Sequence, residues 1–249
     1  MKIIVCIKRV PDTEARIKVA SGGGGIDTAG VKFVISPYDE FAIETALRIK
    51  EAQGAGELIV ISLGEAQSAE QLRSALAMGA DRAVLLKGQP TLDGSATAKA
   101  LAAEIKTHSP DLVLCGMKAV DNDQQQVGVM LAEYLDLPCV SVVAELEVED
   151  GKVVAHREIE GGVEVVEVST PAVITATKGK HEPRYPSLKG IMAAKKKPLE
   201  EKDAQMPAPR LTLKSLTPPA ERAAGKIVGN GADAVPELVR LLKEEAKVL

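Results

Sequence analysis

Residues 111–135 read DLVLCGMKAVDNDQQQVGVMLAEYL, and this stretch decides the fold that the sequence predicts. A short apolar run, Leu112–Cys115, predicts a strand that ends at Gly116, and a polar loop follows it. Asp123 is predicted to cap a helix after the loop, with Gln126 three residues later completing a capping box. Apolar side chains then recur with helical spacing and share one face: Val127, Met130, Leu131, Tyr134 and Leu135.

The loop between this strand and this helix is the first candidate for a functional site. Open α/β sheets bind ligands at the carboxyl ends of their strands, and the free N–H groups at a helix start favour a phosphate. We therefore expect a nucleotide pocket here. Asp121 and Asp123 are also paired carboxylates that can bind a metal or exchange protons. Because no third ligand type stands nearby, helix capping and hydrogen bonding to a bound ligand are the favoured roles.

The same alternation of strand and helix precedes this unit. Continuous apolar runs predict strands at Ile3–Ile7, Glu57–Ser62 and Arg82–Leu86. Helices are predicted from Ser36, from Ser68 with a capping Gln71, and over about Ser95–Thr107. This order is typical of a mostly parallel, doubly wound α/β sheet.

The pattern changes after Pro138. Three alternating runs, at 140–148, 153–158 and 163–168, predict an antiparallel meander, and Pro171–Thr177 predicts one further buried strand. We expect residues 1–180 to form the α/β domain and residues 181–249 to form a recognition loop and an extended C-terminal arm that packs on a partner subunit. The arm is rich in proline and charge, and it is predicted to end in a strand at 226–228 and a helix at 235–248.

Two further motifs have a structural and a functional interpretation. Gly22–Gly25 suggests a phosphate cradle, but its spacing fits neither a dinucleotide fingerprint nor a Walker A loop, so a hairpin tip is favoured. Lys195, Lys196 and Lys197 form a solvated face or steer an acidic partner, and the exposed apolar residues beside them keep both readings open.

Composition excludes several classes of protein. Aromatic residues make up 2% and the net charge is −4, which argues against base stacking and against an electrostatic surface for nucleic acid. The three cysteines and three histidines show no metal-ligand spacing. No apolar run approaches the roughly 18 residues that span a membrane. Lys2 leads directly into a strand, so we expect a cytoplasmic protein without a signal peptide.

Four blocks of the chain resemble the β subunit of electron transfer flavoproteins. They are IVCIKRV near the N-terminus, SPYDEFAIETALRIKE with the later ALAMGADRA, AHREIEGGVEVVEVSTPAVIT at 155–175, and EPRYPSLKGIMAAKKKP in the arm. The resemblance covers essentially the whole chain.

This resemblance implies an adenine-nucleotide α-hydrolase-like fold and an electron carrier without catalysis of its own. It implies a heterodimer with an α subunit that holds most of one FAD, and a structural AMP buried in this subunit. The expected electron donors are dehydrogenases, such as the acyl-CoA dehydrogenases of fatty acid oxidation. The expected acceptor is a membrane quinone oxidoreductase.

The resemblance also assigns residues. The AMP contacts correspond to Cys6, Ser36, Pro37, Tyr38, Asp39, Leu63, Gly116, Met117, Lys118, Ala119, Val120, Asp121, Asn122, Asp123, Gln124, Gln125, Gln126 and Val127. The recognition loop that docks dehydrogenases corresponds to Pro183–Pro198, with Leu188 as its anchor. Its other docking residues are Tyr185, Ile191, Met192, Lys195, Lys196 and Lys197. An aliphatic anchor among mobile contacts suits transient electron transfer.

Thr13 departs from the mitochondrial members of the family, which carry a tyrosine at this position near the flavin. Tyr38 is then the remaining aromatic residue for that role. The sequence Val10-Pro11-Asp12-Thr13 also resembles bifurcating members, in which a second FAD replaces AMP. The other blocks favour the AMP type. A stand-alone nucleotide-binding stress-type protein is an alternative that rests on fold analogy alone.

Overall fold

The computed structural model describes residues 1–89, 91–221 and 224–249. By contacts the chain forms two units, Met1–Ser215 and Leu216–Leu249. The first unit holds the sheet and its covering helices, and the second holds a short helix, α6 (Val235–Glu244). The predicted division at residue 180 separates a nucleotide-binding domain from a segment that packs on a partner subunit, and it stays a prediction. By contacts, however, residues 181–215 belong with the sheet.

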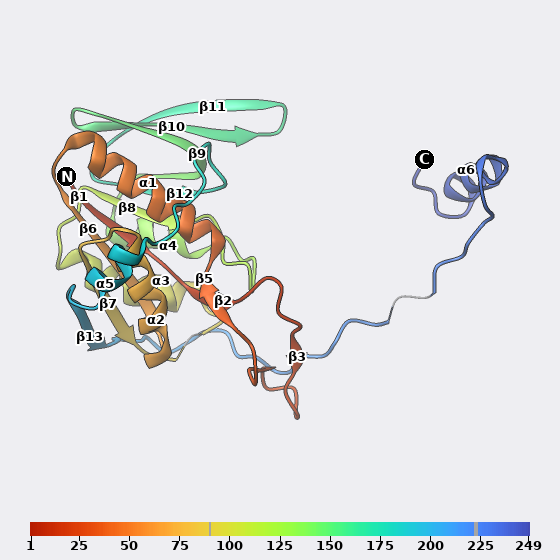
Figure 1. The fold of residues 1–249 in the computed structure, drawn as a ribbon, viewed down its shortest axis with the longest axis horizontal. Coiled ribbons are helices and arrows are strands. Elements are labelled where there is room, and N and C mark those ends of the chain that lie inside the picture. The colour runs from red at the N-terminus through yellow and green to blue at the C-terminus, as the bar shows by residue number, and fades with distance from the viewer. Residues whose placement is uncertain (90, 222–223) are drawn as a thin grey trace. The chain divides into compact units, whose positions relative to one another are not determined.

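The first unit is built on a nine-stranded sheet with the order β11-β10-β9-β12-β8-β1-β6-β7-β13 (Figure 1). In the part β9-β12-β8-β1-β6-β7-β13 of this order, each strand is parallel to its neighbours. The strands β10 and β11 form an antiparallel hairpin that continues the sheet beyond β9. The strand bounds are β1 Lys2–Cys6, β6 Glu57–Gly64, β7 Arg82–Lys87, β8 Leu112–Gly116, β9 Cys139–Glu149, β10 Lys152–Ile159, β11 Gly162–Ser169, β12 Ala172–Ala176 and β13 Leu199–Asp203. The predicted mostly parallel, doubly wound sheet with its meander is confirmed.

Two apolar layers form because successive side chains of a strand point to opposite faces. Ile3 and Val5 of β1 pack with α1 (Pro37–Gln53) and α2 (Ala69–Met78) on one face. Ile4 and Cys6 pack with α3 (Gly94–Lys106) and α4 (Val127–Leu135) on the other. The continuous apolar runs of the parallel strands are therefore explained by burial on both faces.

Both predicted capping boxes are wrong. Asp123 lies before the helix with φ +51°, and α4 begins at Val127 without a side-chain cap. Ser68 ends a 3-10 turn (Ala66–Ser68), and the Gln71 amide instead donates to the Phe33 carbonyl. Asp123 instead accepts from Lys118 of its own loop, and the tertiary contact with Phe33 engages Gln71.

Some shorter segments differ from prediction, and one agrees with it. β13 has the charged sequence LEEKD, which carries no strand pattern, yet it pairs with β7 at the edge of the sheet. Residues 226–228 form no strand, and α6 ends at Glu244 rather than at 248. Gly22–Gly25 forms the tip between β3 (Lys18–Val19) and β4 (Ile26–Asp27), as the favoured hairpin interpretation expected. The next strand, β5 (Phe33–Ile35), pairs with β2 (Arg9–Pro11).

Candidate functional site

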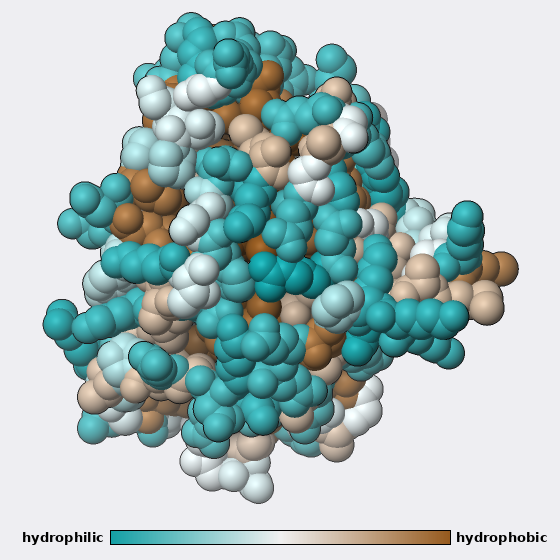
Figure 2. Space-filling view, turned by 90° about the vertical axis from the view of Figure 1, so that its left-hand side faces the viewer, coloured by the Kyte–Doolittle hydropathy of each residue, from teal (hydrophilic) through white to brown (hydrophobic). Residues whose placement is uncertain are grey.

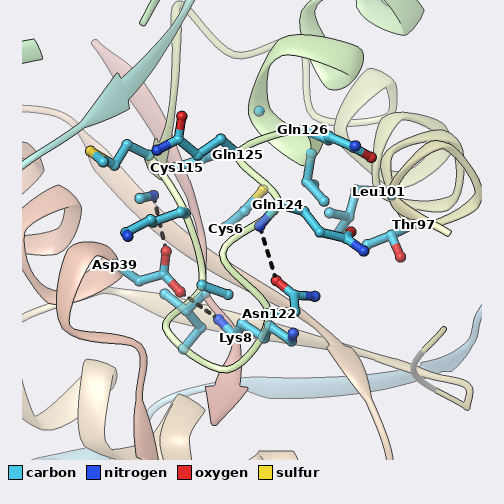
Figure 3. A pocket seen from close by; sticks show the side chains of 18 of the residues that line it. Cys6, Lys8, Asp39, Thr97, Leu101, Cys115, Asn122, Gln124, Gln125 and Gln126 are labelled. Atoms are coloured by element: carbon cyan, nitrogen blue, oxygen red, sulfur yellow. Dashed lines mark hydrogen bonds between the residues drawn. The ribbon is translucent and has the colours of Figure 1, made fainter. Parts of the chain in front are cut away.

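A pocket opens at the carboxyl edge of the sheet, where β1, β6 and β8 end and α3 and α4 begin. Its cavity volume is about 110 Å³. Strand-end residues Cys6 and Cys115 line it together with Leu101 of α3, while Thr97 and the glutamines of the 124–126 loop add polar groups (Figure 3). The wall thus combines apolar surface with polar groups at the start of two helices, which suits a ligand with a flat apolar part and an anionic group.

Asp39 ties the two strand ends of this pocket together. It lies in the first turn of α1 and is 6% exposed. One carboxylate oxygen accepts the backbone N–H of Lys8 at 2.7 Å and the other accepts that of Gly116 at 2.9 Å (Figure 3). Burial raises the pKa of Asp39 to about 7, although the two backbone hydrogen bonds and the charge of Lys8 act in the opposite direction.

Gly116 allows this close approach. A Cβ atom at this position would lie 2.4 Å from the nearer carboxylate oxygen of Asp39 and 2.8 Å from its backbone nitrogen. Any side chain would therefore push the end of β8 away from α1.

The two aspartates of the loop are paired with lysines. Asp121 accepts from Lys8 Nζ at 2.7 Å, and Asp123 accepts from Lys118 Nζ at 2.9 Å. Lys118 Nζ also lies 5.8 Å from the ring centroid of Tyr38. Within the described residues, no cluster of three or more His, Cys, Asp or Glu side chains has the arrangement of a metal site. Both carboxylates are therefore engaged by lysines within the structure, while their hydrogen bonding to a ligand stays a prediction.

The structure brings most of the predicted nucleotide contacts to this pocket. Its lining includes Cys6, Asp39, Leu63, Gly116, Met117, Lys118, Ala119, Asn122, Gln124, Gln125, Gln126 and Val127. Six of the predicted contacts do not line it: Ser36, Pro37, Tyr38, Val120, Asp121 and Asp123. They lie beside the lining in sequence, and Asp121 and Asp123 act on it through Lys8 and Lys118.

Sequence reasoning missed several lining residues: Ile7, Lys8, Thr91, Gly94, Thr97, Leu101, Cys115 and Gly128. Four of them come from the segment after β7 and from the start of α3. The available signal was the strand order, because β7 is parallel to β6 and ends at the same edge.

A second exposed feature lies on α5 (Leu188–Ala194), which Ser187 caps by accepting from the Gly190 N–H at 3.0 Å. Its apolar side chains face outward, with Leu188 83% and Met192 71% exposed, and Tyr185 before the helix is 95% exposed. Ile191 and the lysines 195 and 196 are also exposed. Lys197 differs, since its ammonium donates to the carbonyls of Leu76 and Ala80 at the end of α2. Figure 2 shows one face of the molecule, where hydrophobic patches lie among hydrophilic residues.

The fold and the pocket define a class: a doubly wound α/β protein with a ligand pocket at the carboxyl edge of its parallel strands. In the part of the chain that the structure describes, no helix has the length and apolar character to cross a bilayer.

Comparison with known proteins narrows this class. The pattern of the electron transfer flavoprotein domain matches residues 23–206. The chain is 41% identical to electron transfer flavoprotein subunit beta of Bradyrhizobium diazoefficiens, with all of both chains covered. It is 41% identical to the protein of the same name from Syntrophomonas wolfei, with 100% of this chain and 98% of the other covered. It is 38% identical to the caffeyl-CoA reductase-Etf complex subunit CarD of Acetobacterium woodii, with 98% and 99% covered.

This chain belongs to the electron transfer flavoprotein family, among its beta subunits. Membership implies a role in electron transfer by a flavoprotein and an alpha-subunit partner.

Proposed function

We propose that this chain is the β subunit of a heterodimeric electron transfer flavoprotein and holds a structural AMP in the pocket at the ends of β1, β6 and β8. One FAD, bound mainly by the α subunit, carries the electrons. The donors are dehydrogenases such as acyl-CoA dehydrogenases, and the acceptor is a membrane quinone oxidoreductase. The observation that supports this most is the pocket itself, whose apolar floor and two helix starts suit an adenine nucleotide.

The pocket contributes binding rather than chemistry in this proposal. The carboxylate of Asp39 accepts two backbone N–H groups, and the lysines 8 and 118 are paired with aspartates. These groups hold the strand ends and the loop in place around the nucleotide. FAD supplies the redox chemistry when it is bound. The role of this chain is to orient the α subunit and to exclude water from the nucleotide.

The bifurcating type is the second candidate, and the sequence Val10-Pro11-Asp12-Thr13 favours it. In that case a second FAD takes the place of AMP and NADH is the donor. The relative from Acetobacterium woodii, named as part of a caffeyl-CoA reductase-Etf complex, makes the comparison worth testing.

Identification of the bound nucleotides separates these candidates. The purified heterodimer is heated and the released nucleotides are quantified by chromatography. One AMP and one FAD per dimer are expected, whereas two FAD and no AMP would establish the bifurcating type. If the chain forms a stable homodimer and no 1:1 complex with an α subunit, the stand-alone stress-type alternative is correct instead.

Leu188 is proposed as the anchor that enters an apolar pocket of the dehydrogenase. Leu188→Ala is expected to lower the second-order rate of flavin reduction roughly ten-fold, because an anchor side chain contributes more than about 1.4 kcal/mol. Flavin content should stay normal. Stopped-flow reduction at limiting dehydrogenase concentration measures the effect.

The matched control for this prediction is Val129→Ala, which truncates an exposed aliphatic residue on α4. It should leave the rate within two-fold of the wild type. An unchanged rate in Leu188→Ala would remove this leucine as the anchor.

A further inference from the structure

The segment Pro183–Pro198, here called the docking arm, is bound to α1 near its start and to α2 near its end. We propose that Arg184, through Glu44 and Glu51 of α1, is a positioning residue that holds the docking arm ready for its partner protein. This inference rests on the proposed function, because it concerns how the same arm meets a dehydrogenase.

Arg184 forms the attachment at the start of the arm. Its guanidinium donates to both carboxylate oxygens of Glu44, at 2.8 and 3.0 Å, and its backbone N–H donates to Glu44 at 3.2 Å. The same guanidinium donates to both oxygens of Glu51, at 3.0 Å for one of them. This is fork-to-fork geometry, which fixes direction as well as distance.

The burial of Glu44 makes this attachment different from a surface ion pair. Its side chain is 3% exposed, while that of Arg184 is 33% exposed. Burial alone would raise the pKa of Glu44, but the hydrogen bonds from Arg184 and Arg48 outweigh it and hold the pKa below its usual value. The hydrogen bonds to Arg184 also lower the pKa of Glu51. The carboxylates are therefore charged at neutral pH and available to the arm.

The end of the arm is fastened by a reciprocal pair of helix caps. Arg73 of α2 donates to the carbonyls of Ala194 and Lys197, at 2.6 and 2.8 Å. Lys197 donates in return to the carbonyls of Leu76 and Ala80. Ala194 and Leu76 lie in the last turns of α5 and α2, where carbonyls lack helical partners, and the carbonyls of Lys197 and Ala80 lie just beyond these helices.

In the middle of the arm, α5 approaches α2 closely. A Cβ atom on Gly190 would lie 2.4 Å from the Ala77 carbonyl oxygen. With its inner face held at this distance, α5 presents Leu188, Ile191 and Met192 outward at helical spacing.

This arrangement fits a partner with an apolar pocket and an acidic rim. Leu188 and Met192 supply the apolar contact, and the exposed Lys189, Lys195 and Lys196 supply complementary charge. An arm that is already ordered loses less conformational entropy on binding than a mobile loop does. Arg184 precedes Leu188 by four residues, so its attachment sets where the anchor points.

The experiment uses the assembled heterodimer and an acyl-CoA dehydrogenase in a double-mutant cycle of Arg184→Ala and Leu188→Ala. Arg184→Ala is expected to lower the second-order rate of flavin reduction about ten-fold, through the cost of ordering several side chains on binding. The rate at saturating dehydrogenase should stay within two-fold. In the Leu188→Ala background, Arg184→Ala should add less than two-fold, because both changes act through the same contact.

Hydrogen exchange gives a readout that needs no partner. Amide exchange over residues 185–196 should become faster in Arg184→Ala. Arg184→Lys keeps the positive charge but lacks the guanidinium fork, so its exchange rate should lie between those of the wild type and Arg184→Ala. Glu51→Gln removes only the exposed carboxylate and provides a milder variant if Arg184→Ala fails to fold. It should shift exchange and rate in the same direction.

The outcomes distinguish the two levels of the proposal. If Leu188→Ala alone leaves the rate unchanged, the docking role fails. If Leu188→Ala slows reduction and the effect of Arg184→Ala multiplies with it in full, or if Arg184→Ala changes neither exchange nor rate, the positioning role fails while the docking role stands.

Discussion

Asp39 shows how one residue joins distant parts of this pocket. It lies in the first turn of α1, yet its two oxygens accept from the ends of β1 and β8. The resemblance assigned it as a nucleotide contact among Ser36–Asp39, but its carboxylate is engaged with the backbone. Asp39 lines the pocket and also fixes the two strand ends around it, and its contact with a nucleotide stays a prediction.

The raised pKa of Asp39 predicts a dependence of stability on pH. The pKa is about 7 in the native protein, against about 3.9 in an unfolded chain. The native state therefore binds the proton more tightly, so the stability that Asp39 contributes is full below about pH 4 and is lost as pH rises toward 7. Asp39→Asn removes this titration. As the pH rises from about 4 to 7, the wild-type free energy of unfolding minus that of the variant should fall by up to about 1.4 kcal/mol for each pH unit.

Urea unfolding of both proteins at several values between about pH 4 and pH 7 measures this difference. Asparagine also turns an amide group toward a backbone N–H, which should cost about 1–3 kcal/mol at low pH. A difference that is flat or that rises with pH would contradict the prediction.

At the scale of elements, the close approach of β8 to α1 shapes the pocket. Gly116→Ala should lower the free energy of unfolding by about 1–3 kcal/mol, because the new methyl group meets the backbone and side chain of Asp39. AMP or FAD retained on purification should fall with it, since the end of β8 must move. Thermal unfolding and nucleotide analysis measure the two effects.

Gly162→Ala is the matched control for this substitution. Gly162 also belongs to a strand, β11, but a Cβ atom there meets nothing within 4 Å. Stability and nucleotide content should both stay at wild-type values. Equal losses in the two variants would show that the close approach at Gly116 is unimportant.

Helix caps show why some elements were predicted better than others. The pattern Ser68–Gln71 has the right spacing, but Gln71 is drawn to the Phe33 carbonyl. Asp93, which no pattern singled out, caps α3 by accepting from Ser95 and Ala96. A side-chain cap contributes only about 1 kcal/mol, so tertiary partners can outcompete it.

At the scale of the whole molecule, the chain divides by contacts into two units, and the apolar core belongs to the first. Among the described residues, every buried apolar side chain except Leu241 lies in the first unit. The helix α6 exposes Val235, Leu238 and Val239.

Deleting residues 216–249 should therefore leave the unfolding of the first unit cooperative, with little change in its midpoint. The deletion should weaken assembly with the α subunit, because the exposed apolar side chains of α6 are lost. Calorimetry and size-exclusion chromatography with the α subunit measure the two effects. Leu238→Asp in the full chain should weaken assembly in the same direction. Loss of cooperative unfolding after the deletion would contradict the prediction.

Much of the sheet could be predicted because burial leaves a local signal. Ile3 to Cys6 is apolar at every position because both faces of β1 are covered, and the meander alternates because it is more open. β13 gave no such signal, since an edge strand with charged side chains pairs through its backbone. Lys197 likewise resembled its exposed neighbours until α2 supplied carbonyls for it.

The sequence by itself determined the alternating α/β order, the family, and the strand–loop–helix at 111–135 as a wall of the pocket. The order of elements and the strand–loop–helix follow from apolar periodicity along the chain, whereas the family follows from the resemblance of the four sequence blocks. Only the tertiary structure decided that Lys8 pairs with Asp121, that Thr97 lines the same pocket, and that Arg184 binds Glu44. Those partners are far apart in sequence, and they meet only because parallel strands bring their ends to one edge and helices pack side by side.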